Sequence, residues 1–191
     1  MKILLIIILL VQSLPCQTTD LKSASKKVVR AYEQLNKNSR NDSVQLNYIR
    51  SFPHDWRTFL SVFQPDDLSQ LYPKYDDYTT VLDSLRIKYP VEVGKLLIGL
   101  ACKAKWEADA TGDVQHILGR FAVCNTILFA KLLREQTKSE QNNVIKFLAD
   151  VENHDAYPEY QSIIDNLNAS KQYQLSKKFE IARKLRIREP H

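Results

Sequence analysis

Apolar residues recur along this chain with the spacing of an α-helix. In the segment 56–63 they stand at positions i, i+3, i+4 and i+7, namely Trp56, Phe59, Leu60 and Phe63. The same spacing returns at 78–85 and 160–167, and a longer stripe runs from 114 to 132 over five turns. Each pattern places one apolar face on a helix, and we expect the 56–63 stripe to be core. No stretch alternates with a period of two beside a hairpin turn, so the sequence predicts an all-α protein.

Prolines and capping residues mark where these helices begin and end. Pro53 ends one helix, and Pro90 and Pro158 open two others, because a first-turn proline lacks only an N–H that would stay unpaired. Thr137 with Glu140 three residues later predicts a capping box. The predicted helices cover about 20–37, 42–51, 55–63, 90–110, 137–153 and 170–187, with others through 78–85, 114–132 and 160–167.

The tripeptide Thr111-Gly112-Asp113 predicts a stop and a restart. Gly112 would lie just past the end of one helix, and Asp113 would be the N-cap of the next. Short connections favour antiparallel neighbours, so we predict an irregular bundle of about eight or nine helices arranged largely as antiparallel hairpins. No side-chain signature repeats at a fixed period, so a regular solenoid is not indicated.

The first sixteen residues resemble a secretory signal peptide. Lys2 precedes nine consecutive apolar residues, 3–11, and polar sequence follows. Nine residues are too few to cross about 30 Å of hydrocarbon, whereas a basic start before a short apolar core is typical of export signals. We therefore expect residues 17–191 to form a single exported domain that is periplasmic, secreted or membrane-anchored. The anchored alternative depends on lipidation of Cys16, although Pro15 stands where a small residue is preferred.

Positive charge is concentrated at the C-terminus. The segment 171–191 has seven cations and two anions, whereas 17–170 has nineteen cations and twenty anions and therefore a net charge of −1. The predicted last helix is basic and amphipathic, and its binding candidates are Lys177, Lys178, Arg183, Lys184, Arg186 and Arg188. Such a helix predicts contact with an acidic protein or an anionic membrane surface, although the helix dipole alone also favours cations there. A general nucleic-acid-binding face is not indicated, because the charge is local.

Cys102 and Cys124 flank the 110–113 turn at comparable distances. In a helical hairpin their heights along the two helices would differ by roughly 4–5 Å, so they are a disulfide candidate in an oxidising compartment. Both lie in apolar stretches, however, and free cysteines are often buried. We favour two small core residues that do not meet.

Two clusters combine carboxylates with a histidine near predicted helix corners. One comprises Asp109, Asp113 and His116, and the other comprises Asp150, Glu152 and His154. Such groups could perform general acid–base chemistry if a carboxylate were desolvated. Neither cluster has the spacing of a calcium loop or of a paired-histidine zinc site, so we predict no metal and no cofactor. Polar, solvated helix junctions are the favoured interpretation.

Several segments resemble a group of small exported helical proteins of bacteria to which no activity is attached. The similar segments span about residues 45–165 and comprise Phe52-Pro53, Trp56, Phe59, Phe63, Leu71-Tyr72, Lys105 to Ala110, Gln115 and Phe147 to Asp150. The resemblance implies a bacterial, exported, all-helical domain. It implies no mechanism and no site.

The usual enzyme signatures are missing from the sequence. It has no nucleophile elbow, no paired-histidine zinc motif, no phosphate-binding loop and no dinucleotide fingerprint. We therefore expect a non-enzymatic module of the cell envelope that binds another protein through a helix-face groove or the basic tail. An acidic protein is one option for this partner. The alternatives are an envelope hydrolase that uses one acidic cluster, and an immunity-type inhibitor of a toxin.

Overall fold

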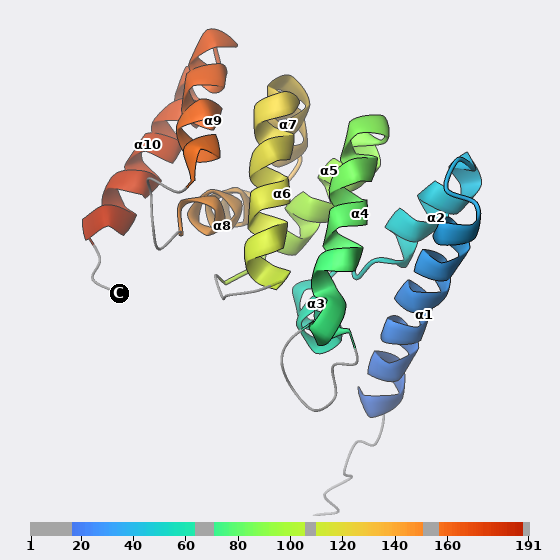
Figure 1. Ribbon diagram of the computed structural model, residues 1–191. Helices are drawn as coiled ribbons and strands as arrows, with labels where there is room; N and C mark the ends of the chain where they lie inside the picture. The colour runs from blue at the N-terminus through green and yellow to red at the C-terminus, as the bar shows by residue number, and fades with distance from the viewer. Residues whose placement is uncertain (1–16, 64–70, 106–109, 151–156, 189–191) are drawn as a thin grey trace, which may run out of the picture.

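The computed structural model describes residues 17–63, 71–105, 110–150 and 157–188, and every regular element in this part of the chain is a helix (Figure 1). The ten α-helices are α1 (Gln17–Lys37), α2 (Asp42–Ser51), α3 (Trp56–Phe63), α4 (Tyr75–Lys88), α5 (Pro90–Ala101), α6 (Ala110–Cys124), α7 (Thr126–Arg134), α8 (Lys138–Ala149), α9 (Pro158–Ala169) and α10 (Tyr173–Arg188). A short 3-10 helix, η1 (Tyr72–Lys74), precedes α4. The all-α prediction is confirmed, with slightly more helices than expected.

Helix starts were the most predictable local features. The capping box before α8 is present, since the Thr137 side chain accepts from the Glu140 backbone and the Glu140 carboxylate accepts from the Thr137 N–H at 3.0 Å. Pro90 and Pro158 occupy the first turns of α5 and α9. These residues satisfy or remove N–H groups that have no partner inside their helix.

The predicted junction at Thr111-Gly112-Asp113 is wrong. Helix α5 ends at Ala101, and α6 begins at Ala110 and runs through all three residues. Asp113 lies inside the first turn of α6 and is therefore not its N-cap, and its Oδ2 accepts a hydrogen bond from Thr79 Oγ1 of α4 at 2.5 Å. A glycine inside a helix costs only about 1 kcal/mol relative to alanine, so tertiary packing of the buried first turn overrides it.

The stripe predicted as one helix over 114–132 is two helices. Helices α6 and α7 meet at Asn125 with a bend of 113°. Side chains bond the carbonyls that the break releases: Thr126 Oγ1 donates to Ala122 O at 3.0 Å, and Asn166 of α9 donates to Val123 O at 3.1 Å. The bend therefore has polar support that apolar spacing cannot reveal.

Within the described ranges no single helix is long and apolar enough to cross a membrane. In the part of the chain that the structure describes, only α6 and α7 taken together, as a bent pair, have the length and composition of a span.

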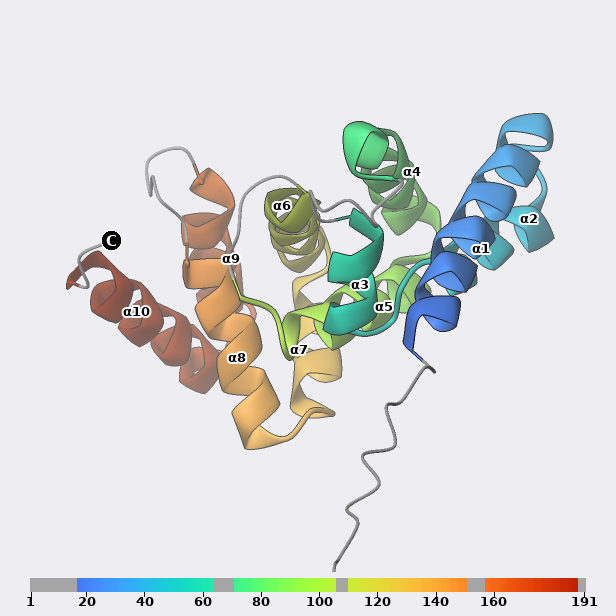
Figure 2. The same ribbon diagram turned by 90° about the horizontal axis from the view of Figure 1, so that it is seen from below.

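The helices follow one another across the molecule in chain order, from α1 at one end to α10 at the other (Figures 1 and 2). Helix α1 packs on α2 and α3, α4 packs on α5 and α6, and α10 packs on α8 and α9. Each helix thus contacts mainly helices near it in the sequence. This leaves α10 at an edge of the molecule with one side uncovered.

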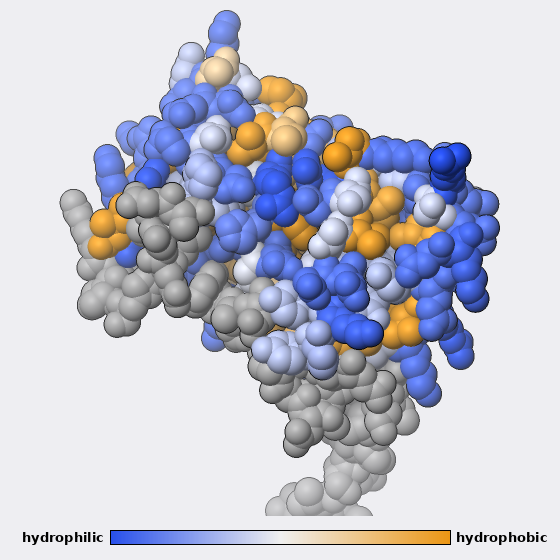
Figure 3. Space-filling model, in the orientation of Figure 1, coloured by the Kyte–Doolittle hydropathy of each residue, from blue (hydrophilic) through white to orange (hydrophobic). Residues whose placement is uncertain are grey.

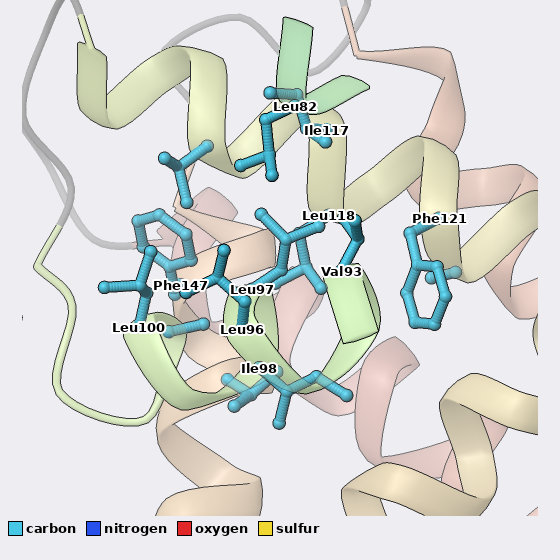
Figure 4. Close-up of a cluster of buried hydrophobic side chains, with 14 of the residues drawn as sticks. Leu82, Val93, Leu96, Leu97, Ile98, Leu100, Ile117, Leu118, Phe121 and Phe147 are labelled. Atoms are coloured by element: carbon cyan, nitrogen blue, oxygen red, sulfur yellow. The ribbon is translucent and has the colours of Figure 1, made fainter. Parts of the chain in front are cut away.

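The core is centred on α5. Val93, Leu97 and Leu100 of this helix are fully buried, and they lie among side chains of α4, α6 and α8 that include Leu82, Leu118 and Phe147 (Figure 4). The 56–63 stripe belongs to the same core, as predicted, because its aromatic residues are all buried and the Trp56 ring lies 5.9 Å from that of Phe147. Aromatic packing thus joins α3 to α8.

Candidate interaction groove between α8 and α10

The described members of the two acidic clusters each bond or pack against a different segment of the chain. Asp113 bonds Thr79 of α4, the half-buried His116 meets the Tyr157 ring edge-on at 5.1 Å between centroids, and Asp150 pairs with Arg186 of α10. The other three members, Asp109, Glu152 and His154, lie outside the described residues. Among the residues that are described, no group of three or more His, Cys, Asp or Glu side chains could hold a metal ion. The geometry offers structural roles for these three groups.

The two described cysteines are free thiols. Cys102 is buried and Cys124 is exposed, so the alternative of a bond between them does not hold in this structure. Burial raises the pKa of the Cys102 thiol to about 11, and its S–H points to Gln136 Oε1 at 3.8 Å. Cys102 is therefore an unreactive core residue at neutral pH. Cys16 lies outside the described residues.

A groove of about 600 Å³ lies between α8 and α10. Its floor is apolar, since Ile145 and Ala149 of α8 are only 2% and 3% exposed and Ala182 of α10 is half-buried. Its α10 rim has two exposed apolar side chains, Ile181 at 48% and Leu185 at 53%. The apolar floor and the apolar rim together form a surface whose hydration is unfavourable.

Two polar bridges cross the groove from α8 to α10. Lys178 Nζ donates to Gln141 Oε1 at 3.4 Å, and Arg186 Nε donates to Asp150 Oδ1 at 2.5 Å. The earlier residue of α8 meets the earlier residue of α10, so the two helices run in the same direction. Eight residues separate the bridging positions on α10, which corresponds to roughly 12 Å of helix.

The groove walls are fixed from beneath by buried hydrogen bonds. Gln115 of α6 is 2% exposed, and its Nε2 donates to Phe147 O at 2.5 Å and to Asp150 O at 2.9 Å. This amide therefore holds the end of α8 and the position of Asp150. On the other side, Tyr160 of α9 donates to Phe179 O of α10 at 2.7 Å. Both walls are positioned before any partner arrives.

A second hollow of about 450 Å³ adjoins the groove where α10 begins. Lys178 lines both hollows, and the described lining of the second also contains Arg134 and Lys171 but no carboxylate. Arg134 donates to Gln172 there. The cationic character of the groove therefore continues beyond its first bridge.

Exposed large apolar side chains are concentrated on α10. Of seven in the described residues, four lie on this helix: Tyr173, Ile181, Leu185 and Ile187. Only Ile181 and Leu185 line the groove. On the face shown in Figure 3, apolar side chains reach the surface in separate patches among hydrophilic ones.

The predicted tail cations do not share one environment. Lys178 and Arg186 line the groove, whereas Arg183 lies on the α9 side, where it donates to Gln161 Oε1 at 2.7 Å and its guanidinium stands 5.9 Å from the Tyr160 ring centre. Lys177 and Lys184 are exposed, and the side chain of Arg188 lies outside the described residues.

Sequence reasoning missed the half of the groove that α8 supplies. Lys146, for example, reads as an ordinary cation in the last turn of a helix, and no local pattern places it opposite α10. The sequence does contain one indication of a binding surface on the last helix. Ile181 and Leu185 are four residues apart, and both interrupt its polar face.

Comparisons with protein families, with curated proteins and with solved structures found no match for this chain.

Proposed function

We propose that the protein is a non-enzymatic interaction module of the cell envelope and that it binds another protein through the groove between α8 and α10. The observation that carries the proposal is the preformed groove, with its apolar floor and with Ile181 and Leu185 exposed on its rim. Exposed apolar residues that gather beside a concave surface are typical of interaction sites. The two described carboxylates of the acidic clusters, Asp113 and Asp150, are bonded to Thr79 and Arg186, which favours the groove over an acid–base site.

The envelope location is supported by the N-terminal sequence, where a basic residue precedes nine apolar ones. Intact mass spectrometry of the protein from native soluble and membrane fractions tests this part. A soluble species that begins at Gln17 supports export with cleavage, and a lipidated species that begins at Cys16 supports an anchored form. Full-length protein confined to the cytosol would contradict the envelope location.

Site-specific photocrosslinking in the native cell tests the groove. A benzophenone amino acid at Leu185 should give an adduct with a protein partner, and the same group at Ile87 should not. Ile87 is the matched control because it is also apolar and, at 77%, exposed. The partner protein in the adduct is then identified and purified. Its affinity for the wild-type chain is compared with its affinity for the Leu185→Asp variant.

At least tenfold weaker binding to Leu185→Asp supports the proposal. Leu185 is already half exposed, so this change should leave the thermal midpoint unaltered. Equal adducts from Leu185 and Ile87, or equal affinities of the two proteins, would place the interaction elsewhere.

A further inference from the structure

We infer that the occupant of the α8–α10 groove is an acidic amphipathic helix of the partner protein. In this arrangement its apolar side chains cover Ile181 and Leu185, and its carboxylates face Lys146 and Lys178. This inference rests on the proposed function, since it names the chemistry of the partner at the same site.

The charged side chains that line the groove are mainly cationic. Lys146, Lys178 and Arg186 line it, and Arg134 and Lys171 line the adjoining hollow. Among the described residues of the two linings, Asp150 is the single carboxylate, and Arg186 already pairs with it. In the described part of the chain neither Lys146 nor Lys178 forms an ion pair.

This cationic surplus is local, because residues 17–170 have a net charge of −1. A partner with carboxylates would therefore be attracted to this edge of the molecule in particular. A cationic partner would be repelled from it.

The shape of the groove favours a helix. Its walls are two helices that run in the same direction, and its bridges are separated by roughly 12 Å, or about two helical turns. Ile181 and Leu185 are four residues apart and form one apolar ridge, which a third helix can meet with residues at i, i+3, i+4 and i+7. An extended peptide would find no open sheet edge, since the described elements are all helical.

A membrane surface fits this site less well. Ile145 and Ala149 lie in the floor of the groove, below the level that a flat bilayer would reach. A narrow helix can enter the groove, whereas a lipid surface would rest on its rim.

The first measurement uses a designed probe. It is an 18-residue fluorescein-labelled peptide with leucines along one helical face and glutamates on both flanks of that face. Fluorescence anisotropy with the purified full chain should show binding that weakens as salt is raised. Two matched peptides, one with lysines in place of the glutamates and one with glutamines in place of the leucines, should each bind at least tenfold more weakly.

Charge reversal in the protein then locates the probe. The double variant Lys146→Glu/Lys178→Glu should weaken binding of the acidic peptide at least tenfold and should strengthen binding of the lysine peptide. That gain of binding cannot come from misfolding. The control variant Lys95→Glu/Lys131→Glu changes two exposed lysines on α5 and α7 and should alter either affinity less than twofold.

The outcomes separate the inference from the proposed function. If the acidic peptide fails to bind but the crosslinked partner still binds Leu185→Asp more weakly than the wild type, the groove is an interaction site and the inferred partner chemistry is wrong. If phosphatidylglycerol vesicles bind and the peptide does not, the occupant is a lipid surface and the inference is overturned. If neither peptide, vesicle nor crosslinked protein depends on groove residues, both proposals fail.

Discussion

The glycines of α5 allow a direct test of how tightly the core is packed. A Cβ added at Gly94 would collide with three ring atoms of Phe121 on α6, whereas a Cβ added at Gly99 would meet nothing closer than His54 O at 3.9 Å. Phe121 is completely buried and its ring lies edge-on to Phe129 at 6.4 Å, so it has little room to move away. The two glycines therefore share one helix but have opposite surroundings.

Alanine at either position gains about 1 kcal/mol of helix propensity. At Gly99 we expect this gain to appear as higher stability, up to about 1 kcal/mol. At Gly94 it is offset by overpacking, which costs about 1–3 kcal/mol in a close-packed core. The difference between Gly94→Ala and Gly99→Ala isolates the collision, because propensity contributes similarly to both.

Urea unfolding monitored by far-ultraviolet circular dichroism measures both free energies of unfolding. The same measurement is then made on Phe121→Leu alone and on the double variant Phe121→Leu/Gly94→Ala. The smaller side chain should remove most of the penalty, which corresponds to a coupling energy of about 0.5–3 kcal/mol between the two positions. If Gly94→Ala stabilised the protein as much as Gly99→Ala does, the close contact between α5 and α6 would be refuted.

Three further predictions concern single side chains. Gln115→Leu should lower the free energy of unfolding by about 1–3 kcal/mol in urea titrations, because two backbone carbonyls lose a donor; an unchanged value would mean that water replaces the amide. Brief treatment of the folded protein with iodoacetamide should modify Cys124 and leave Cys102 intact until denaturant is added, as peptide mass mapping can show; equal labelling would contradict the burial of Cys102. Burial alone would raise the pKa of Asp55, but hydrogen bonds from Thr58 N at 2.9 Å and Thr58 Oγ1 at 2.7 Å outweigh it and hold the pKa below its usual range. This stabilisation is complete above the ordinary carboxyl pKa and is lost as the pH falls through the lowered one, so Asp55→Asn should flatten the loss of stability below about pH 4; a curve parallel to that of the wild type would refute the assignment.

Local chemistry predicted much of the helical architecture. The 56–63 stripe is core because aromatic residues at helical spacing have no other favourable place, and Thr137 begins α8 because its hydroxyl accepts from an N–H that the helix leaves unpaired. Long-range contacts decided where prediction failed. Thr79 bonds Asp113, and Asn166 supports the break after Cys124, and neither partner is near in sequence.

The groove shows the same division. Basic residues on the last helix were predictable as a local concentration of charge, and Lys178 and Arg186 do line the groove. Its other wall depends on the direct packing of α8 against α10 and on the buried amide of Gln115, which holds the end of α8. Local patterns therefore identify one wall of the site, and only tertiary contacts identify the other.

The packing of helices in chain order has a consequence for the dynamics of the C-terminal edge. Helix α10 is held mainly by α8 and α9, so we expect it to open more readily than the centre of the molecule, and its amide hydrogens should exchange with solvent earlier than those of α5. A partner seated between α8 and α10 would bind only the closed state. Occupancy of the groove would therefore slow amide exchange along α10, and the C-terminal edge would gain local stability in proportion to the partner's concentration.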